Sequence, residues 1–116
     1  MNLKTFKQTL QSTPKSINFT DTITIIEELY QFTPAAFTNG TLYNNANQNN
    51  GSCKVFAFAL KQQLTKEETL ACFGQYYFED VLQNPTGNDH QNIRNFINTG
   101  FEGLRFEKEP LVRKSN

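Results

Sequence analysis

The sequence has no tryptophan, only two cysteines and a single histidine in 116 residues. Cys53 and Cys72 can form at most one disulfide, so a disulfide scaffold is excluded and a reducing compartment is the simpler interpretation. A closed zinc site of cysteine and histidine would run short of ligands, and the two thiols lack the spacing of a redox motif. The sequence therefore predicts no bound metal, no cofactor and a cytoplasmic location.

Long apolar runs and an excess of one charge sign are also missing. The 11 Lys and Arg balance the 11 Asp and Glu, so no overall positive field attracts nucleic acid. No stretch approaches the roughly 18 apolar residues that a membrane-spanning helix needs. We therefore expect no nucleic-acid partner and no membrane span. Phenylalanine, in contrast, occurs 11 times, and with the recurring aliphatic residues it predicts one folded domain over residues 1–116.

Acidic residues are absent from the first 16 positions. Leu3, Phe6 and Leu10 fall on one face of a helix, which is typical of a short amphipathic helix docked on a core. An acid-poor amino terminus also fits an export segment, so residues 1–16 carry two interpretations. At the other end, residues 112–116 are predicted to form a frayed tail.

Most of the chain carries helix signals, and the predicted fold class is mainly α, with about five helices. Asn18 and Asp21 are placed to cap a helix that runs to about Gln31. Thr65 and Glu68 form a capping box for a helix further along the chain. The other predicted helix ends are Ser52 as an N-cap, Asn88 capping together with Gln91, and Gly100 as a terminating residue.

The segment from Val55 to Leu60 is the most ambiguous, because six apolar residues in a row show no clear period. A buried strand would explain it, but a capping Ser52 favours a helix. That helix would place Cys53, Phe56 and Leu60 on one face.

One small β-hairpin is predicted near Asn39-Gly40. These two residues readily take the positive φ angles of a tight turn between Phe37 and Tyr43. The polar residues 44–50 that follow contain nothing that can be buried, so they should form a loop.

Cys53, near the start of a predicted helix, is the most chemically suggestive residue. The positive end of the helix dipole and the adjacent Lys54 both favour the reactive thiolate. His90 is the one histidine that can act as a base, and Gln48 could donate to an oxyanion, which together would make a cysteine-dependent hydrolase. The competing interpretation is that Cys53 and His90 are packing residues, because free cysteines are usually buried.

A third interpretation is a pocket for a small polar ligand. The Asn-rich loop and the polar segment 89–92 would frame it. The candidate binding residues are Asn47, Asn49, Asp89 and Asn92.

Four stretches of the sequence, residues 32–40, 47–59, 70–77 and 89–96, resemble the HopJ type III effector family. The resemblance runs in the family's order from about Phe19 to Pro110. The sequence departs from the family pattern at Phe78, where a basic residue is expected, and at Phe101, where a tryptophan is frequent. The resemblance implies a small bacterial protein, cytoplasmic or exported by a type III secretion system, without catalytic residues to transfer.

The leading functional prediction is therefore a protein that binds a protein partner or a small polar ligand and is not an enzyme. The alternative is the hydrolase with a Cys53–His90 pair.

Overall fold

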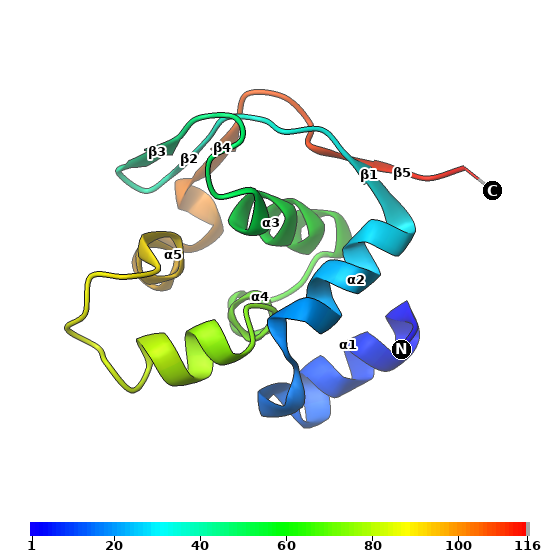
Figure 1. Cartoon of the computed structure of the whole chain (residues 1–116), viewed down its shortest axis with the longest axis horizontal. Coiled ribbons are helices and arrows are strands. Elements are labelled where there is room, and N and C mark those ends of the chain that lie inside the picture. Colours follow the sequence, from blue (N-terminus) through cyan, green and yellow to red (C-terminus); the bar gives the residue numbers. More distant parts are fainter. Residues whose placement is uncertain (116) are drawn as a thin grey trace.

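The computed structural model describes residues 1–115 and is mainly α (Figure 1). Its α-helices are α1 (Leu3–Ser12), α2 (Phe19–Leu29), α3 (Asn50–Gln62), α4 (Lys66–Ala71) and α5 (Gln91–Thr99). Shorter turns are the 3-10 helices η1 (Pro14–Ser16) and η3 (Gly100–Gly103) and the π-helix η2 (Tyr76–Val81). The strands are β1 (Tyr30–Phe32), β2 (Phe37–Asn39), β3 (Leu42–Asn44), β4 (Leu104–Phe106) and β5 (Leu111–Arg113).

The strands form two antiparallel sheets above the helices (Figure 1). β1 pairs with β5, and β2 lies between β3 and β4. The predicted hairpin is therefore present, but the sheet is larger than one hairpin because β4 adds a third strand.

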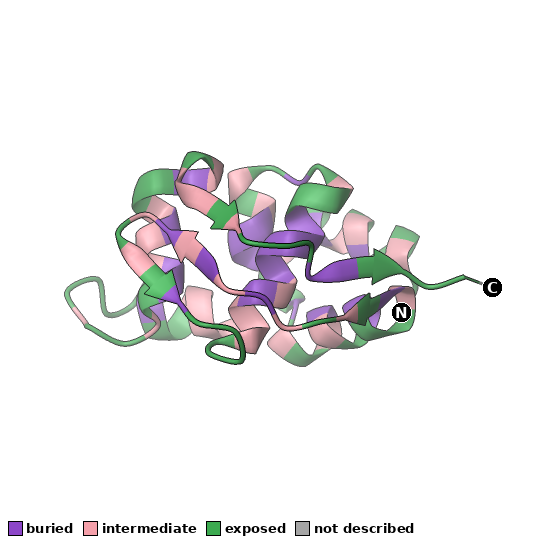
Figure 2. Ribbon diagram, turned by 90° about the horizontal axis from the view of Figure 1, so that it is seen from above, coloured by how far each residue is buried: buried purple, intermediate pink, exposed green. Residues whose placement is uncertain are grey.

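α3 lies at the centre of the molecule and is covered by helices on one side and by the strands on the other (Figures 1 and 2). Val55, Phe56, Phe58 and Ala59 are completely buried. A helix that is apolar all round is a core helix, which explains why this segment shows no amphipathic period. The prediction of a helix here is confirmed.

Two details of the α3 prediction are wrong. The N-cap residue is Asn49, not Ser52. Leu60 is 46% exposed, so it does not share a buried face with Cys53 and Phe56.

α2 begins where the capping signal places it, and the N–H of Asn18 donates to the carboxylate of Asp21 at 3.0 Å. The helix ends at Leu29 instead of Gln31, because Tyr30–Phe32 pair as β1 with β5. β5 includes Val112 and Arg113, which were predicted to fray. Asn116, the last residue of that predicted tail, lies outside the described residues.

The turn of the hairpin is one residue later than predicted. Asn39 pairs with Leu42, so the two turn residues are Gly40 and Thr41. Of these two only Gly40 has a positive φ, +62°, which suits a turn that needs glycine at its first central position. Asn39 is the last residue of β2 and is completely buried.

The helix predicted from Thr65 is interrupted. The capping box is confirmed, with Glu68 N–H donating to the Thr65 hydroxyl at 3.1 Å. The α-helix then ends at Ala71, Gly74 takes a φ of +59°, and the chain continues as η2. A Cβ at Gly74 would lie 2.6 Å from the backbone nitrogen of Phe19. The break between α4 and η2, the α4–η2 corner, therefore packs directly against the first residue of α2.

α1 docks on the core through Phe6 and Leu10, which are 0% and 3% exposed. The Phe6 ring meets Phe58 edge to face at 6.1 Å between centroids. In residues 1–115 we find no helix with the length and apolar character that crossing a bilayer requires.

Candidate functional site

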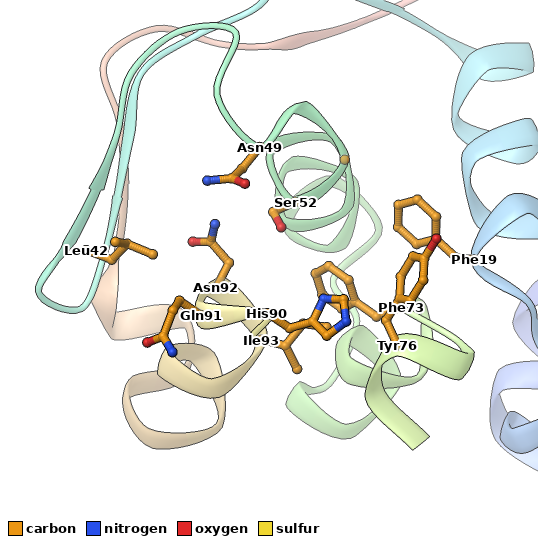
Figure 3. Close-up of a pocket in the computed structure, with 11 residues that line it drawn as sticks. Phe19, Leu42, Asn49, Ser52, Phe73, Tyr76, His90, Gln91, Asn92 and Ile93 are labelled. Carbon is orange, nitrogen blue, oxygen red and sulfur yellow. The ribbon is translucent and has the colours of Figure 1, made fainter. Parts of the chain in front are cut away.

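A cavity of about 520 Å³ opens where three helices begin, beside the β2–β3 hairpin (Figure 3). Its polar side is lined by Asn49, Gly51, Ser52, His90, Gln91 and Asn92. Its apolar side is lined by Phe19, Leu42, Phe73, Tyr76 and Ile93. Sites for small molecules combine such an apolar wall with a few convergent polar groups.

The two helices on the polar side begin without a side-chain cap from any residue of 1–115. Their N-cap residues, Asn49 and His90, have φ angles of +55° and +49°. The first N–H groups of a helix have no acceptor within the helix, and the helix dipole places partial positive charge there. Two helix starts with free N–H donors therefore border the same cavity.

Behind this wall, asparagine side chains form a buried network. Asn92 Oδ1 accepts from Asn39 Nδ2 at 3.0 Å and from Asn44 Nδ2 at 3.2 Å. Asn44 Oδ1 accepts in turn from Asn92 Nδ2 at 2.9 Å and Asn49 Nδ2 at 2.7 Å. Among the described residues, Asn39 Oδ1 has no hydrogen-bond partner. The network fixes the amide orientations of Asn49 and Asn92, the two members that line the cavity.

His90 is held at the rim of the cavity by contacts on two sides. Its ring stacks on Tyr76 with 5.1 Å between centroids. Its Nε2 lies 2.9 Å from Asp80 Oδ2, on η2, and 3.9 Å from Asp89 Oδ2. Arg94 hydrogen-bonds to Oδ1 of Asp89 and lowers the pKa of that carboxyl below its ordinary value. Asp80, Asp89 and His90 thus bring three possible metal ligands within 4.8 Å of one another.

The structure brings together some of the candidate ligand-binding residues and not others. Asn49 and Asn92 line the cavity, as does His90. Asp89 lies next to His90 in the chain but is not among the lining residues. Asn47 is exposed, with a φ of +72°, and also lies outside the lining set.

Cys53 is placed away from this cavity, in the core. The thiol is 1% exposed, and its nearest polar contact is the backbone oxygen of Ala35, 3.7 Å from Sγ. Burial raises the pKa of Cys53, although the Ala35 contact and the neighbouring Lys54 lower it in part. Burial likewise raises the pKa of Cys72.

No hydrogen bond links Cys53 to His90 in the part of the chain that the structure describes. Gln48 Oε1 accepts from the N–H of Asn45 within the loop at 2.9 Å. A cysteine hydrolase needs a thiol within hydrogen-bond reach of its base. The Cys53–His90 hydrolase therefore stays a prediction, and the observed environment favours a packing role for the thiol.

Sequence reasoning missed Phe19, Ser52, Tyr76 and Asp80 as members or neighbours of the site. Of these four residues, Ser52 was predicted only as the N-cap of a helix. Asp80 and His90 are ten residues apart in the sequence and come into contact because the loop after η2 folds back. No local sequence pattern indicates this fold-back.

Comparisons with known proteins agree on one relationship. The family described as HopJ type III effector protein matches residues 3–111. The crystal structure of an "unknown function protein", VPA0580, is 58% identical in sequence and similar with a TM-score of 0.95. That match covers 98% of this chain and 95% of the other. No curated protein matches the chain.

Proposed function

This chain belongs to the HopJ type III effector protein family, and we propose that it is a binding protein that takes a small molecule into the cavity at the start of α3 and α5. The ligand has a polar end that accepts hydrogen bonds and an apolar, aromatic body. The observation that carries the proposal is the pairing of two uncapped helix starts with an aromatic wall across one cavity.

The polar side of the cavity offers mostly donors. The free N–H groups of the first turns of α3 and α5 are joined by the hydroxyl of Ser52. The amide nitrogens of Asn49 and Asn92 each use one N–H in the buried network and keep the other. A ligand that accepts hydrogen bonds satisfies these groups, whereas an ammonium group would meet further donors and the positive helix ends.

The lack of cationic side chains in the lining favours a ligand with no more than one negative charge. No Lys, Arg, Asp or Glu from residues 1–115 lines the cavity. A phosphate dianion is normally held by cationic side chains, and the carboxylates of Asp80 and Asp89 beside His90 disfavour it further. A single carboxylate, which backbone N–H groups and amides can hold, fits this site better.

The aromatic side of the cavity sets the size and affinity of the ligand. The ring of Phe19 packs against those of Phe73 and Tyr76, with ring centroids 6.3 Å and 5.0 Å away. Burying roughly 150 Å² of apolar ligand surface contributes about 4 kcal/mol. The hydrogen bonds at the polar end offset the cost of association, so the expected dissociation constant is about 1 mM.

The test is an NMR titration of ¹⁵N-labelled protein with a panel of small aromatic carboxylates and their matched amines. Phenylacetate and phenethylamine form one such pair. We expect saturable shifts of the amide signals of Gly51, Ser52 and Gln91 with carboxylates and none with amines. Carboxylates that leave these signals unmoved throughout the panel would contradict the proposal.

Two substitutions with matched controls locate the site. Ser52→Phe fills the cavity and should abolish the shifts, whereas Ser12→Phe, on the exposed end of α1, should not. Gln91→Glu places a negative charge in the first turn of α5 and should weaken carboxylate binding about fivefold or more, while the helix dipole offsets the loss of the hydrogen bond from Gln91 Nε2 to the Asn88 backbone oxygen. Gln8→Glu adds the same charge on α1, away from the cavity, and should leave binding unchanged.

Family membership also supports export by a type III secretion system. Export, a cytoplasmic location before it, and binding of a protein partner stay predictions. Fractionation of cells with and without a functional secretion apparatus tests the first two.

A further inference from the structure

We infer that Asp80, Asp89 and His90 form a site for a divalent transition-metal ion at the rim of the cavity. The three side chains come from η2, from the loop after it, and from the N-cap of α5. Asp80 and Asp89 do not line the cavity, so the inference stands independently of the ligand proposed above.

The geometry suits a small cation. His90 Nε2 lies 2.9 Å from Asp80 Oδ2 and 3.9 Å from Asp89 Oδ2, and all three ligand atoms lie within 4.8 Å of one another. Ligands placed 2.0–2.1 Å from a tetrahedral Zn²⁺ are separated by about 3.3 Å. Small side-chain rotations are therefore enough to bring the three atoms into one coordination sphere.

The donor set selects the type of ion. One imidazole nitrogen with two carboxylate oxygens suits Zn²⁺ and similar transition metals, whereas Mg²⁺ and Ca²⁺ prefer sets made of oxygen alone. Three protein ligands leave a fourth position open, as in metal sites that also bind an exogenous group. Since His90 lines the cavity, this position lies at its rim.

Contacts from outside the three ligands hold two of them in place. Arg94 hydrogen-bonds to Oδ1 of Asp89, and Oδ2 of the same carboxylate lies toward His90. Arg94 also donates to the backbone oxygens of Asp89 and Asn84, at 2.6 Å and 2.9 Å, which fixes the loop. Stacking on Tyr76 fixes the plane of the His90 ring. Metal ligands are commonly oriented by such outer contacts.

The charges also favour a cation. Two carboxylates face the imidazole of His90, and one guanidinium, that of Arg94, pairs with only one of them, Asp89. A divalent ion between the ligands replaces the hydrogen bond between His90 and Asp80 and balances the remaining negative charge.

The test uses the full chain without a histidine tag, treated with a chelator and then titrated with ZnCl₂ or MgCl₂ in a calorimeter. We expect one Zn²⁺ per chain with micromolar affinity and no binding of Mg²⁺. Asp80→Asn and Asp89→Asn keep the side-chain shape and should each weaken Zn²⁺ binding about tenfold or more. Glu79→Gln, the matched control next to Asp80 on η2, should leave the affinity unchanged.

A second measurement identifies the ligand atom. His90 is the one histidine of the chain, so the ¹⁵N signals of its imidazole need no assignment by mutation. Saturating Zn²⁺ should shift the Nε2 signal strongly. Absence of saturable Zn²⁺ binding, binding that leaves the imidazole signals unmoved, or full affinity in both aspartate variants would each overturn the inference.

Discussion

Gly74→Ala tests the corner where the cavity wall is built. Gly74 has a φ of +59°, and a Cβ there would lie 2.6–2.8 Å from backbone atoms of Ile17, Asn18 and Phe19. The left-handed conformation costs alanine about 1.5 kcal/mol, and overpacking against backbone costs about 1–3 kcal/mol. Reduced freedom of the unfolded chain offsets about 0.5 kcal/mol. The expected net loss in the free energy of unfolding is about 2–4 kcal/mol.

The matched control is Gly40→Ala. Gly40 has nearly the same φ, +62°, but a Cβ there meets only side-chain atoms, the nearest being those of Thr99 at 3.3 Å. The expected loss is therefore about 1 kcal/mol, which is the cost of the conformation less the same offset from the unfolded chain.

Urea denaturation followed by circular dichroism measures both losses, and thermal melting provides a second reading. For a chain of this length 1 kcal/mol corresponds to about 4 °C, so Gly74→Ala should melt about 8–16 °C below the wild type. The corner also carries the hydrogen bond from the N–H of Phe19 to Gln75 at 3.0 Å, so the amide signal of Phe19 should shift in the variant. Equal losses for the two variants would refute the argument, since backbone overlap is what separates them.

Other expected outcomes follow from the caps, the buried amides and the thiols. Thr65→Ala removes the cap of α4 and should lower the free energy of unfolding by about 1 kcal/mol in urea denaturation. Asn44→Ala removes the acceptor of Asn92 Nδ2 and Asn49 Nδ2 and should cost about 2–3 kcal/mol in the same assay. A loss below about 0.5 kcal/mol, roughly that of a neutral surface change, would show that water replaces the network. Iodoacetamide at pH 8 should alkylate Cys53 and Cys72 slowly in the native protein and rapidly in urea, and fast native labelling of Cys53 would favour the hydrolase. Burial raises the pKa of both thiols above the ordinary value of 9.0, so the folded state holds their protons more tightly than the unfolded state. The thiols therefore leave the free energy of unfolding unchanged below pH 9 and should lower it as the pH rises above 9. Urea midpoints at pH 8 and pH 10 measure this loss.

Local signals in the sequence placed the starts of α2 and α4 correctly, but the N-cap residues of α3 and α5 are Asn49 and His90 instead of the predicted Ser52 and Asn88. The capping residues Asn18 and Thr65 act within one turn of the chain, so their effect does not depend on distant residues. Gly100, with a φ of +60°, terminates α5 for a similar local reason.

Elements that depend on distant partners were placed less well. The residues after Leu29 continue a helical pattern, but the edge of β5 offers Tyr30–Phe32 hydrogen bonds as a strand. β4 was likewise missed as a partner of β2, since neither strand carries a signal for the other. Propensity is a weak preference, and pairing across the fold overrides it.

The amino-acid sequence by itself determined a mainly helical fold, because its apolar residues recur at helical spacing and its caps act within a few residues. Only the tertiary structure determined that a cavity exists and which residues line it, since Phe19, Ser52 and His90 belong to three helix starts that are far apart in the chain. It also decided that Cys53 is buried and that His90 faces Asp80. The reason is that the neighbours of a side chain across the fold set its exposure, its pKa and its partners, and those neighbours follow from how the whole core packs around α3.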